Sequence, residues 1–429
     1  MRNKFFGLLV LLMLSTTARA DLDVTITGAD TAASPIAVVP FAGLNANEVD
    51  MAKVIEADLG RTGQFRALSR SSMPEQPSDA AGVNLPSWRA VNVDNVVVAQ
   101  AKRDPATGKV QVRFYLIDAV RGGTPLLVYD MPAVMSNQLR YVAHQISDLI
   151  YQKLTGIPGF FTTKIAYVTV NGMGAARRFE LVVADYDGDS PRAIAVSREP
   201  LMSPAWSPDR KQLAYVGYER GRQSVYIQSL STGQVRKLVS EKGINGSPAW
   251  SPDGSKIAVT LSFETNPDIY IIDVASGARR RLTDQYGIDT EAAWSPDGQT
   301  LVFTSDRGGQ PQIYQVPASG GDAKRVTFVG KQNLKASYSP DGKSLVVVNY
   351  DDARYRIALL DLASGAMKII SDGPLDESPS FAPNGMVVIY ATQDRRGVGL
   401  ATSSIDGRVR LRLSQPGEVH EPVWSPQTK

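Results

Sequence analysis

The chain has 429 residues, enough for two domains with a sizeable buried core, and it contains no cysteine. The lack of cysteine excludes disulfides, a thiol nucleophile and a thiolate metal site. Its 46 basic and 43 acidic residues give a net charge of only +3, which argues against nucleic acid and anionic membranes as partners.

Residues 1–20 have the order of features that is typical of a signal peptide. Arg2 and Lys4 precede an apolar run, Phe5 to Leu14, that is too short to span a bilayer as a mature helix. Ala18-Arg19-Ala20 then supplies a small-x-small cleavage site, so the mature chain is predicted to begin at Asp21. The alternative is a buried amino-terminal strand or helix. No later stretch approaches about 18 apolar residues, so no membrane insertion is predicted.

Residues 21–157 lack a repeat and are predicted to form a small α/β domain. The expected strands are residues 36–41, 96–99, 110–117 and 126–129, and apolar residues at helical spacing predict helices around 51–59 and 139–154. Asn45 and Glu48 fit an N-cap and its partner for the first helix. The segment Asp21, Leu22, Asp23, Val24, Thr25, Ile26 and Thr27 alternates polar and apolar residues, so it is either an edge strand or a tail that pairs with another protein.

A turn motif recurs through the rest of the chain. An aromatic residue followed by Ser-Pro-Asp, or a close variant, begins at Trp206, Trp250, Trp294, Tyr338, Phe381 and Trp424, with spacings of 44, 44, 44, 43 and 43. A period of this length is typical of a propeller or a helical array. Each unit contains four short strand patterns and no helical period, which favours the propeller. The aromatic residue is predicted to pack between neighbouring units.

The first and last units are each incomplete. The strand at residues 165–170 has no turn motif before it, and Trp424 has no strand after it. We therefore predict that residues 421–424 form the innermost strand of the blade that begins at Ile165. The predicted fold is an α/β amino-terminal domain, residues 21–157, followed by an all-β six-bladed propeller, residues 158–429, closed by the carboxy-terminal strand.

Little in the sequence indicates catalysis. There is no G-x-S-x-G motif, and the two histidines, His144 and His420, lie far apart in the sequence. The stretch from Asp185 to Asp189 resembles a calcium loop but loses the spacing after Gly188, so it is interpreted as a hairpin turn. No metal, cofactor or catalytic residue is predicted. Two alternatives stay open: a propeller enzyme with carboxylates such as Asp376 and Glu377, or a sugar- or peptidoglycan-binding module.

The loops that lead into the innermost strands should surround one end of the central channel. They carry an excess of acidic residues, which predicts a mainly acidic mouth that binds a protein partner. Its candidate residues are Glu199, Asn245, Asp289, Thr290, Glu291, Lys335, Asp376, Glu377, Glu418, His420 and Glu421. An outer ring of arginines is predicted around it: Arg177, Arg178, Arg220, Arg222, Arg307, Arg354, Arg356, Arg395 and Arg396. The alternative is that these are ordinary solvated loop charges.

Taken together, an exported chain, a small α/β domain and six turn-marked blades resemble the TolB family of the Tol–Pal system of Gram-negative bacteria. Specific similarities are Pro35-Ile-Ala-Val-Val-Pro40, Ser247-Pro-Ala-Trp-Ser-Pro-Asp-Gly254, Phe303-Thr-Ser-Asp306 and Pro383-Asn-Gly-Met-Val-Val-Ile-Tyr390. The chain departs from the pattern at Arg210, which replaces the turn glycine, and at Phe381-Ala-Pro-Asn384.

The resemblance implies a monomeric, non-enzymatic adaptor of the periplasm. It implies that the mouth binds the peptidoglycan-associated lipoprotein and that the mature amino-terminal segment binds the inner-membrane protein TolA. The system helps to draw the outer membrane inward at division and maintains its integrity, and some bacteriocins use the same mouth. The resemblance also implies that the two binding events are coupled.

Overall fold

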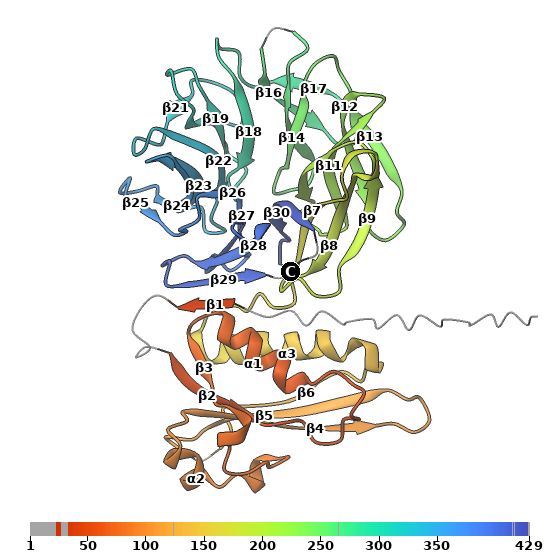
Figure 1. Ribbon diagram of the computed structural model, residues 1–429, viewed down its shortest axis with the longest axis vertical. Helices are drawn as coiled ribbons and strands as arrows, with labels where there is room; N and C mark the ends of the chain where they lie inside the picture. The colour runs from red at the N-terminus through yellow and green to blue at the C-terminus, as the bar shows by residue number, and fades with distance from the viewer. Residues whose placement is uncertain are drawn as a thin grey trace, which may run out of the picture.

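The computed structural model describes residues 23–26, 33–122, 124–264, 266–413, 415 and 417–427. The predicted signal peptide, and Asp21, Leu22 and Thr27 of the amino-terminal segment, lie outside the described residues. Figure 1 shows an α/β domain below a ring of small sheets, with the helices α1 and α3 between the domain's own sheet and the ring.

The amino-terminal domain is built on a five-stranded sheet with the order β3-β2-β4-β5-β6. β2 runs parallel to β3 and β4, whereas β4, β5 and β6 pair antiparallel. The predicted strands are observed, and β3 is an additional short strand that the sequence did not reveal. The strands are β2 (Ser34–Val38), β3 (Phe65–Ala67), β4 (Asn95–Arg103), β5 (Val110–Asp118) and β6 (Leu127–Asp130).

Three helices cover the two faces of this sheet. α1 (Met51–Arg61) and α3 (Leu139–Thr155) pack on one face, and α2 (Leu85–Ala90) buries Trp88 on the other. Short 3₁₀ helices occupy Arg70–Ser72, Ala80–Gly82, Ser136–Gln138 and Gly174–Ala176. The predicted N-cap at Asn45 is wrong. Glu48 does accept a hydrogen bond from the Asn45 amide, but the helix begins at Met51 because Asp50 caps it by accepting from the Lys53 amide.

The remaining strands form four-stranded antiparallel blades, which we number along the chain. Blade 1 is β30 (Glu418–Trp424), β7 (Lys164–Asn171), β8 (Arg178–Asp185) and β9 (Arg192–Ser197). Blade 2 is β10 (Leu201–Trp206), β11 (Gln212–Glu219), β12 (Arg222–Ser229) and β13 (Val235–Val239). Blade 3 is β14 (Asn245–Trp250), β15 (Lys256–Leu261), β16 (Asp268–Asp273) and β17 (Arg279–Arg281).

Blades 4 to 6 repeat this arrangement. Blade 4 is β18 (Asp289–Trp294), β19 (Thr300–Ser305), β20 (Gln312–Pro317) and β21 (Lys324–Arg325). Blade 5 is β22 (Gln332–Tyr338), β23 (Ser344–Asp351), β24 (Arg354–Asp361) and β25 (Met367–Ile369). Blade 6 is β26 (Leu375–Phe381), β27 (Val387–Asp394), β28 (Gly397–Ser404) and β29 (Val409–Leu413). A single parallel pair, Tyr355 with Leu375, joins blades 5 and 6 into one continuous sheet.

The carboxy-terminal strand β30 pairs antiparallel with β7, the partner that the two incomplete sequence units indicate. Trp424 lies opposite Ile165, and the Ser425 amide donates to the Lys164 carbonyl. Each innermost strand contacts the next, from β10 through β14, β18, β22 and β26 to β30, and β30 contacts β10. The two ends of the propeller sequence therefore meet in blade 1.

The two faces of the ring differ in their connections. The mouth face carries the loops that lead into the innermost strands. The turn face carries the aromatic-Ser-Pro-Asp corners, where each Ser hydroxyl donates to the Asp two residues later, as Ser251 does to Asp253 at 2.6 Å. The tryptophans bridge blades, as predicted: the indole Nε1 of Trp250 donates to the Ala205 carbonyl of the preceding blade.

The amino-terminal domain packs against the turn face at blades 1 and 6. One hydrophobic cluster runs from the helices into Phe160, Phe161, Tyr186 and Trp424, so the two domains share a buried core. β1 (Asp23–Ile26) pairs antiparallel with β29 as an extra edge strand of blade 6 (Figure 1).

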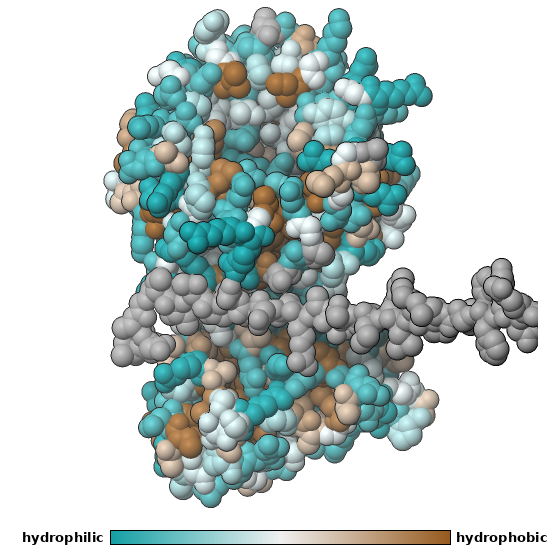
Figure 2. Space-filling view, viewed as in Figure 1, coloured by the Kyte–Doolittle hydropathy of each residue, from teal (hydrophilic) through white to brown (hydrophobic). Residues whose placement is uncertain are grey.

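The surface seen in Figure 2 is mostly hydrophilic, with hydrophobic residues scattered over both domains. Within the described ranges, none of the helices combines the length and the apolar character that a membrane span requires.

Candidate functional site

A cavity of about 670 Å³ opens at the mouth face. Its walls combine apolar side chains, such as Leu334, Tyr355 and Leu375, with charged ones. It brings together six of the predicted mouth residues: Glu291, Lys335, Asp376, Glu377, His420 and Glu421.

Every innermost strand has a β-bulge at the same point, three residues before its turn aromatic. The bulged residues have φ between +47° and +57°, a left-handed conformation that non-glycine residues seldom adopt, and we call them the bulge ring: Ser203, Ser247, Glu291, Lys335, Ser378 and Glu421. Five of them line both the mouth cavity and a smaller cavity of about 280 Å³ below it. The bulge ring thus divides the central channel.

Lys335, in blade 5, is bonded to three other blades across this ring. Its Nζ donates to Ser378 Oγ at 2.9 Å and lies 3.3 Å from a Glu421 carboxylate oxygen. Its backbone amide donates to Glu291 at 3.0 Å. Burial alone would lower the pKa of Lys335, but Glu421, Glu291 and Glu377 hold it above its ordinary value, so the lysine stays charged.

Glu377 and His420 form a second pair at the mouth, with 3.4 Å between His420 Nδ1 and the carboxylate. The hydrogen bond with His420 lowers the pKa of Glu377, and the same bond, helped by Glu418 and Glu421, raises that of His420. The side chain of Glu377 is 43 % exposed, so this carboxylate is accessible to a partner.

Three predicted mouth residues do not present their side chains to a partner. Asn245, Asp289 and Asp376 are buried. The Asn245 amide group holds the Glu241 and Gly243 carbonyls, Asp289 accepts from Arg307 at 2.6 Å, and Asp376 accepts from Ser371 and Thr392. These side chains hold the loops in shape. The sequence alone could not distinguish this structural role from that of an exposed polar or charged residue.

Glu199 and Thr290 lie outside the mouth cavity, unlike Asp376. Glu199 accepts from the Gly221 amide on the β11–β12 turn at 3.1 Å, and Thr290 accepts from the Thr260 hydroxyl. The predicted arginine ring is likewise partly structural: Arg307 pairs with Asp289 and stacks over Phe303. Arg177 does line the mouth cavity.

Sequence reasoning missed a group of exposed apolar residues on the loops into blades 3 to 6. They are Ile244, Tyr286, Ile288, Phe328, Val329 and Leu375, with Tyr286 99 % and Phe328 73 % exposed. Tyr286 and Phe328 therefore place exposed aromatic side chains on the mouth loops. An aromatic residue inside an otherwise polar loop was the signal in the sequence that could have revealed this group. The mouth face is thus apolar on one side as well as acidic at its centre.

The described part of the amino-terminal segment is the strand β1. Asp23 lies opposite Arg412 and Ile26 opposite Val409, so the backbone of residues 23–26 extends the sheet of blade 6. An edge strand is one of the two states that the sequence left open.

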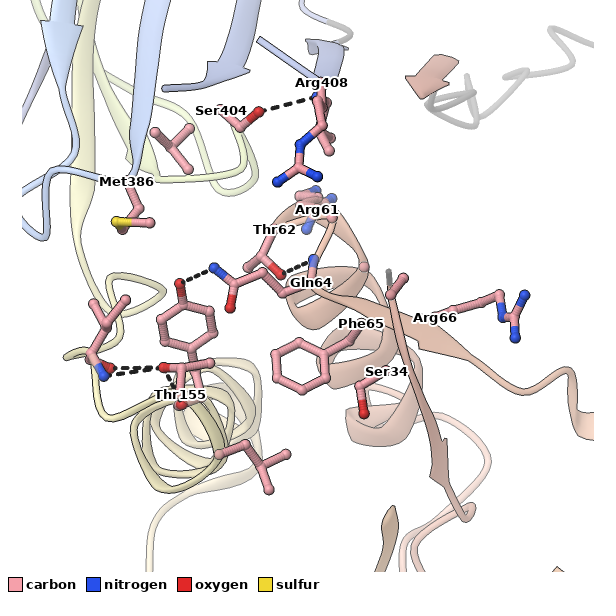
Figure 3. Close-up of a pocket in the computed structure, with 18 of the residues that line it drawn as sticks. Ser34, Arg61, Thr62, Gln64, Phe65, Arg66, Thr155, Met386, Ser404 and Arg408 are labelled. Carbon is pink, nitrogen blue, oxygen red and sulfur yellow. Dashed lines mark hydrogen bonds between the residues drawn. The ribbon is translucent and has the colours of Figure 1, made fainter. Parts of the chain in front are cut away.

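A second cavity, of about 780 Å³, lies between the two domains. Figure 3 shows Arg61, Gln64 and Thr155 of the amino-terminal domain facing Met386, Ser404 and Arg408 of blade 6 across it. The Gln64 amide donates to the Tyr151 hydroxyl at 3.1 Å on its wall.

Asp58, His144 and Asp187 form the only group of three or more potential metal ligands among the described residues. Arg61 and Arg140 already pair with Asp187, at 3.5 and 2.5 Å. The positive charge beside Asp187 comes from these two guanidinium groups and not from a metal ion. We therefore interpret the cluster as an ionic contact between the two domains. The hairpin interpretation of residues 185–189 is confirmed, because they form the β8–β9 turn.

Comparison with known proteins gives a consistent result over nearly the whole chain. Residues 22–124 match the model described as the TolB amino-terminal domain, and residues 151–428 the TolB beta propeller domain. The chain is 57 % identical to the Tol-Pal system protein TolB of Methylococcus capsulatus over 418 residues, which cover 97 % of each chain. It is 57 % identical to that of Thioalkalivibrio sulfidiphilus, covering 98 % of this chain and 97 % of the relative. The crystal structure of TolB from Acinetobacter baumannii superposes with a TM-score of 0.88 at 39 % identity, covering 95 % of this chain and all of that one.

Proposed function

This chain belongs to the TolB family of Tol–Pal system proteins, a non-enzymatic family, and we propose that it is a periplasmic adaptor. In this proposal the mouth binds the peptidoglycan-associated lipoprotein, and residues 21–27 bind the inner-membrane protein TolA. The pair of contacts supports inward movement of the outer membrane at division and maintains its integrity.

The observation that supports the mouth proposal most directly is its combination of accessible charge and apolar surface. Glu377 and His420 are partly exposed beside the cavity, and the apolar loops of blades 3 to 6 surround one side of it. An acidic centre with an apolar margin suits a protein partner that carries a basic group and an apolar face.

Charge reversal at the mouth tests this proposal. Glu377→Lys should weaken binding of the purified lipoprotein at least tenfold, because it replaces an accessible carboxylate by a third cation beside Lys335 and His420. Asp322→Lys is the matched control, since Asp322 is exposed in the β20–β21 turn on the turn face. Unchanged affinity in Glu377→Lys, or equal loss in both variants, would contradict a mouth site.

Deletion of residues 21–27 tests the amino-terminal contact. β1 pairs only with the outer edge of β29, so its removal leaves all four strands of blade 6. TolA binding should be lost while lipoprotein binding stays. Loss of both interactions, or of neither, would show that the segment is not a separate site.

The same mouth is proposed to serve bacteriocins that enter through the Tol–Pal system. The exposed Tyr286 and Phe328 also keep a sugar- or peptidoglycan-binding module as a second candidate, since aromatic faces stack on sugars. A pull-down from envelope extract separates the two: an adaptor retains a lipoprotein after muramidase treatment, whereas a glycan binder loses its captured material.

A further inference from the structure

A buried carboxylate, Asp58 on α1, is bonded from both domains. His144 Nδ1 lies 2.8 Å from Asp58 Oδ2, and the Ser147 hydroxyl donates to the same oxygen at 2.7 Å. From blade 1, the Tyr186 hydroxyl donates to Asp58 Oδ1 at 2.6 Å. The β8–β9 turn of the propeller thus contacts both α1 and α3.

The charged groups around His144 come from three elements. α1 supplies Asp58 and Arg61, α3 supplies Arg140, and the turn supplies Asp187 and Asp189 beside the Tyr186 hydroxyl. Asp148, one turn further along α3, bonds instead to Phe161 and Thr162. Three carboxylates and two guanidinium groups therefore surround His144, of which Asp189 is solvent-exposed and Asp58 is fully buried.

The histidine ring is fixed between the domains. It contacts Tyr186 edge-on, with 5.5 Å between ring centroids and an interplanar angle of 82°. Tyr186 in turn stacks on Trp424, the last residue of the closing strand β30. Arg61 belongs both to this cluster and to the wall of the interdomain cavity. A change at His144 therefore acts on the domain contact itself.

We propose that the His144–Asp58 pair is a proton-dependent latch, which holds the amino-terminal domain more firmly against blade 1 when His144 is protonated. Deprotonation of His144 replaces its ion pair with the fully buried Asp58 carboxylate by a neutral hydrogen bond, and a charge-assisted hydrogen bond is roughly twice as strong as a neutral one.

The direction of the titration agrees with this geometry. Burial, with no hydrogen-bonding partner for Nε2 among the described residues, favours the neutral ring. The hydrogen bond to Asp58 and the charges of Asp58 and Asp187 outweigh it and raise the pKa of His144. A raised pKa means that the stabilisation is complete below about pH 6.5 and is lost as the pH rises through the folded-state value.

The chain has only two histidines, so nuclear magnetic resonance can follow each titration in the full mature protein. His144 should titrate above about 6.5. Asp58→Asn should lower that value, as should Asp187→Asn if Asp58→Asn does not fold, since both carboxylates raise the pKa of His144. A His144 that titrates below 6.5 would overturn the proposal.

Hydrogen exchange in α1 and α3 measures the domain contact. After correction for intrinsic rates, exchange should rise between pH 6 and pH 8.5 by up to about tenfold for each unit of raised His144 pKa. His144→Gln should remove this pH dependence, and His420→Gln, which changes only the mouth histidine, should keep it. Equal protection at both pH values in the parent protein, or persistence of the dependence in His144→Gln, would show that His144 is only structural.

Discussion

The turn face and the mouth face of the ring are made by the same strands but follow different rules. On the turn face the chemistry repeats: Ser207, Ser251, Ser295 and Ser339 each donate to an Asp two residues later at 2.6 Å. On the mouth face the backbone repeats, with six bulges of positive φ, but the side chains there are Ser, Ser, Glu, Lys, Ser and Glu.

The difference separates what builds the ring from what distinguishes its blades. An interaction that blades 2 to 5 make in the same way maintains the turn geometry that these blades share. Side chains that differ from blade to blade on a repeated backbone break the symmetry of the channel. Three blades carry the charged residues Glu291, Lys335 and Glu421, and the other three carry serines. Function in this fold is therefore expected on the mouth face and stability on the turn face.

The strand β30 crosses from one face to the other, so removing residues 420–429 should have the largest effect. The deletion exposes the inner edge of β7 and removes Trp424 from the interdomain core. We expect the unfolding midpoint to fall by more than 10 °C, or no folded protein, because ring closure is lost. Circular dichroism melting against a chain lacking only Thr428 and Lys429 measures this. Coincident melting curves would contradict closure by β30.

Substituting single turn-face tryptophans should have the next largest effect. Trp424 is buried, contacts Phe160 and Tyr186 and donates to Thr163 at 2.7 Å. Trp424→Ala should cost about 3–5 kcal/mol of unfolding free energy. Trp294→Ala, in a half-buried position whose indole donates to the Ala249 carbonyl of the preceding blade, should cost about 2 kcal/mol. Denaturant unfolding compares them, and equal losses would show that the domain contact adds nothing.

The repeating face was also the predictable one. The aromatic-Ser-Pro-Asp spacing indicated the blades, the bridging role of the aromatic residues and the pairing of β30 with β7. The signal was strong because each blade repeats the same local requirements of turn geometry. The two long helices were predictable for a similar reason, since their buried faces follow the helical period.

The mouth was predictable only in part, because burial there depends on loop conformation. Glu377 and Asp376 are neighbours in sequence, yet one is exposed and the other is bonded inside its loop. The bulge conformation of Lys335 or Glu291 leaves no mark in the residue type, and the cluster around Asp58 joins residues that are 86 and 128 positions apart. Such contacts follow from tertiary packing alone.

The cost of a positive φ can be compared between the two faces at two residues of blade 3, Ser247 in β14 and Gly254 in the turn that follows it. Gly254 has φ +72°, and an added Cβ would meet only ordinary contacts, so Gly254→Ala should cost about 1 kcal/mol through the backbone alone. Ser247 has φ +47° in the bulge ring, and Ser247→Gly should be neutral or stabilising by up to about 1 kcal/mol, because relief of strain offsets the flexibility of glycine. Denaturant unfolding of both variants gives the sign. Destabilisation by Ser247→Gly would mean that the bulge is not strained.

The smallest expected effect concerns the charge of a turn aspartate. Hydrogen bonds from the Ser251 hydroxyl and from the amide and hydroxyl of Ser255 lower the pKa of Asp253 to about 2. Asp253→Asn should lose only about 0.5 kcal/mol at pH 7, since the group is solvent-screened and an amide oxygen still accepts. The sixth turn shows that asparagine suffices, because Asn384 Oδ1 accepts from the Met386 amide. A carboxylate with a depressed pKa stabilises the fold fully above its ordinary pKa, and this stabilisation decreases as the pH falls from 3.8 to about 2. The difference between parent and variant should therefore persist at pH 3 in denaturant unfolding, and its disappearance already at pH 4 would show that the turn does not hold the carboxylate in its charged form.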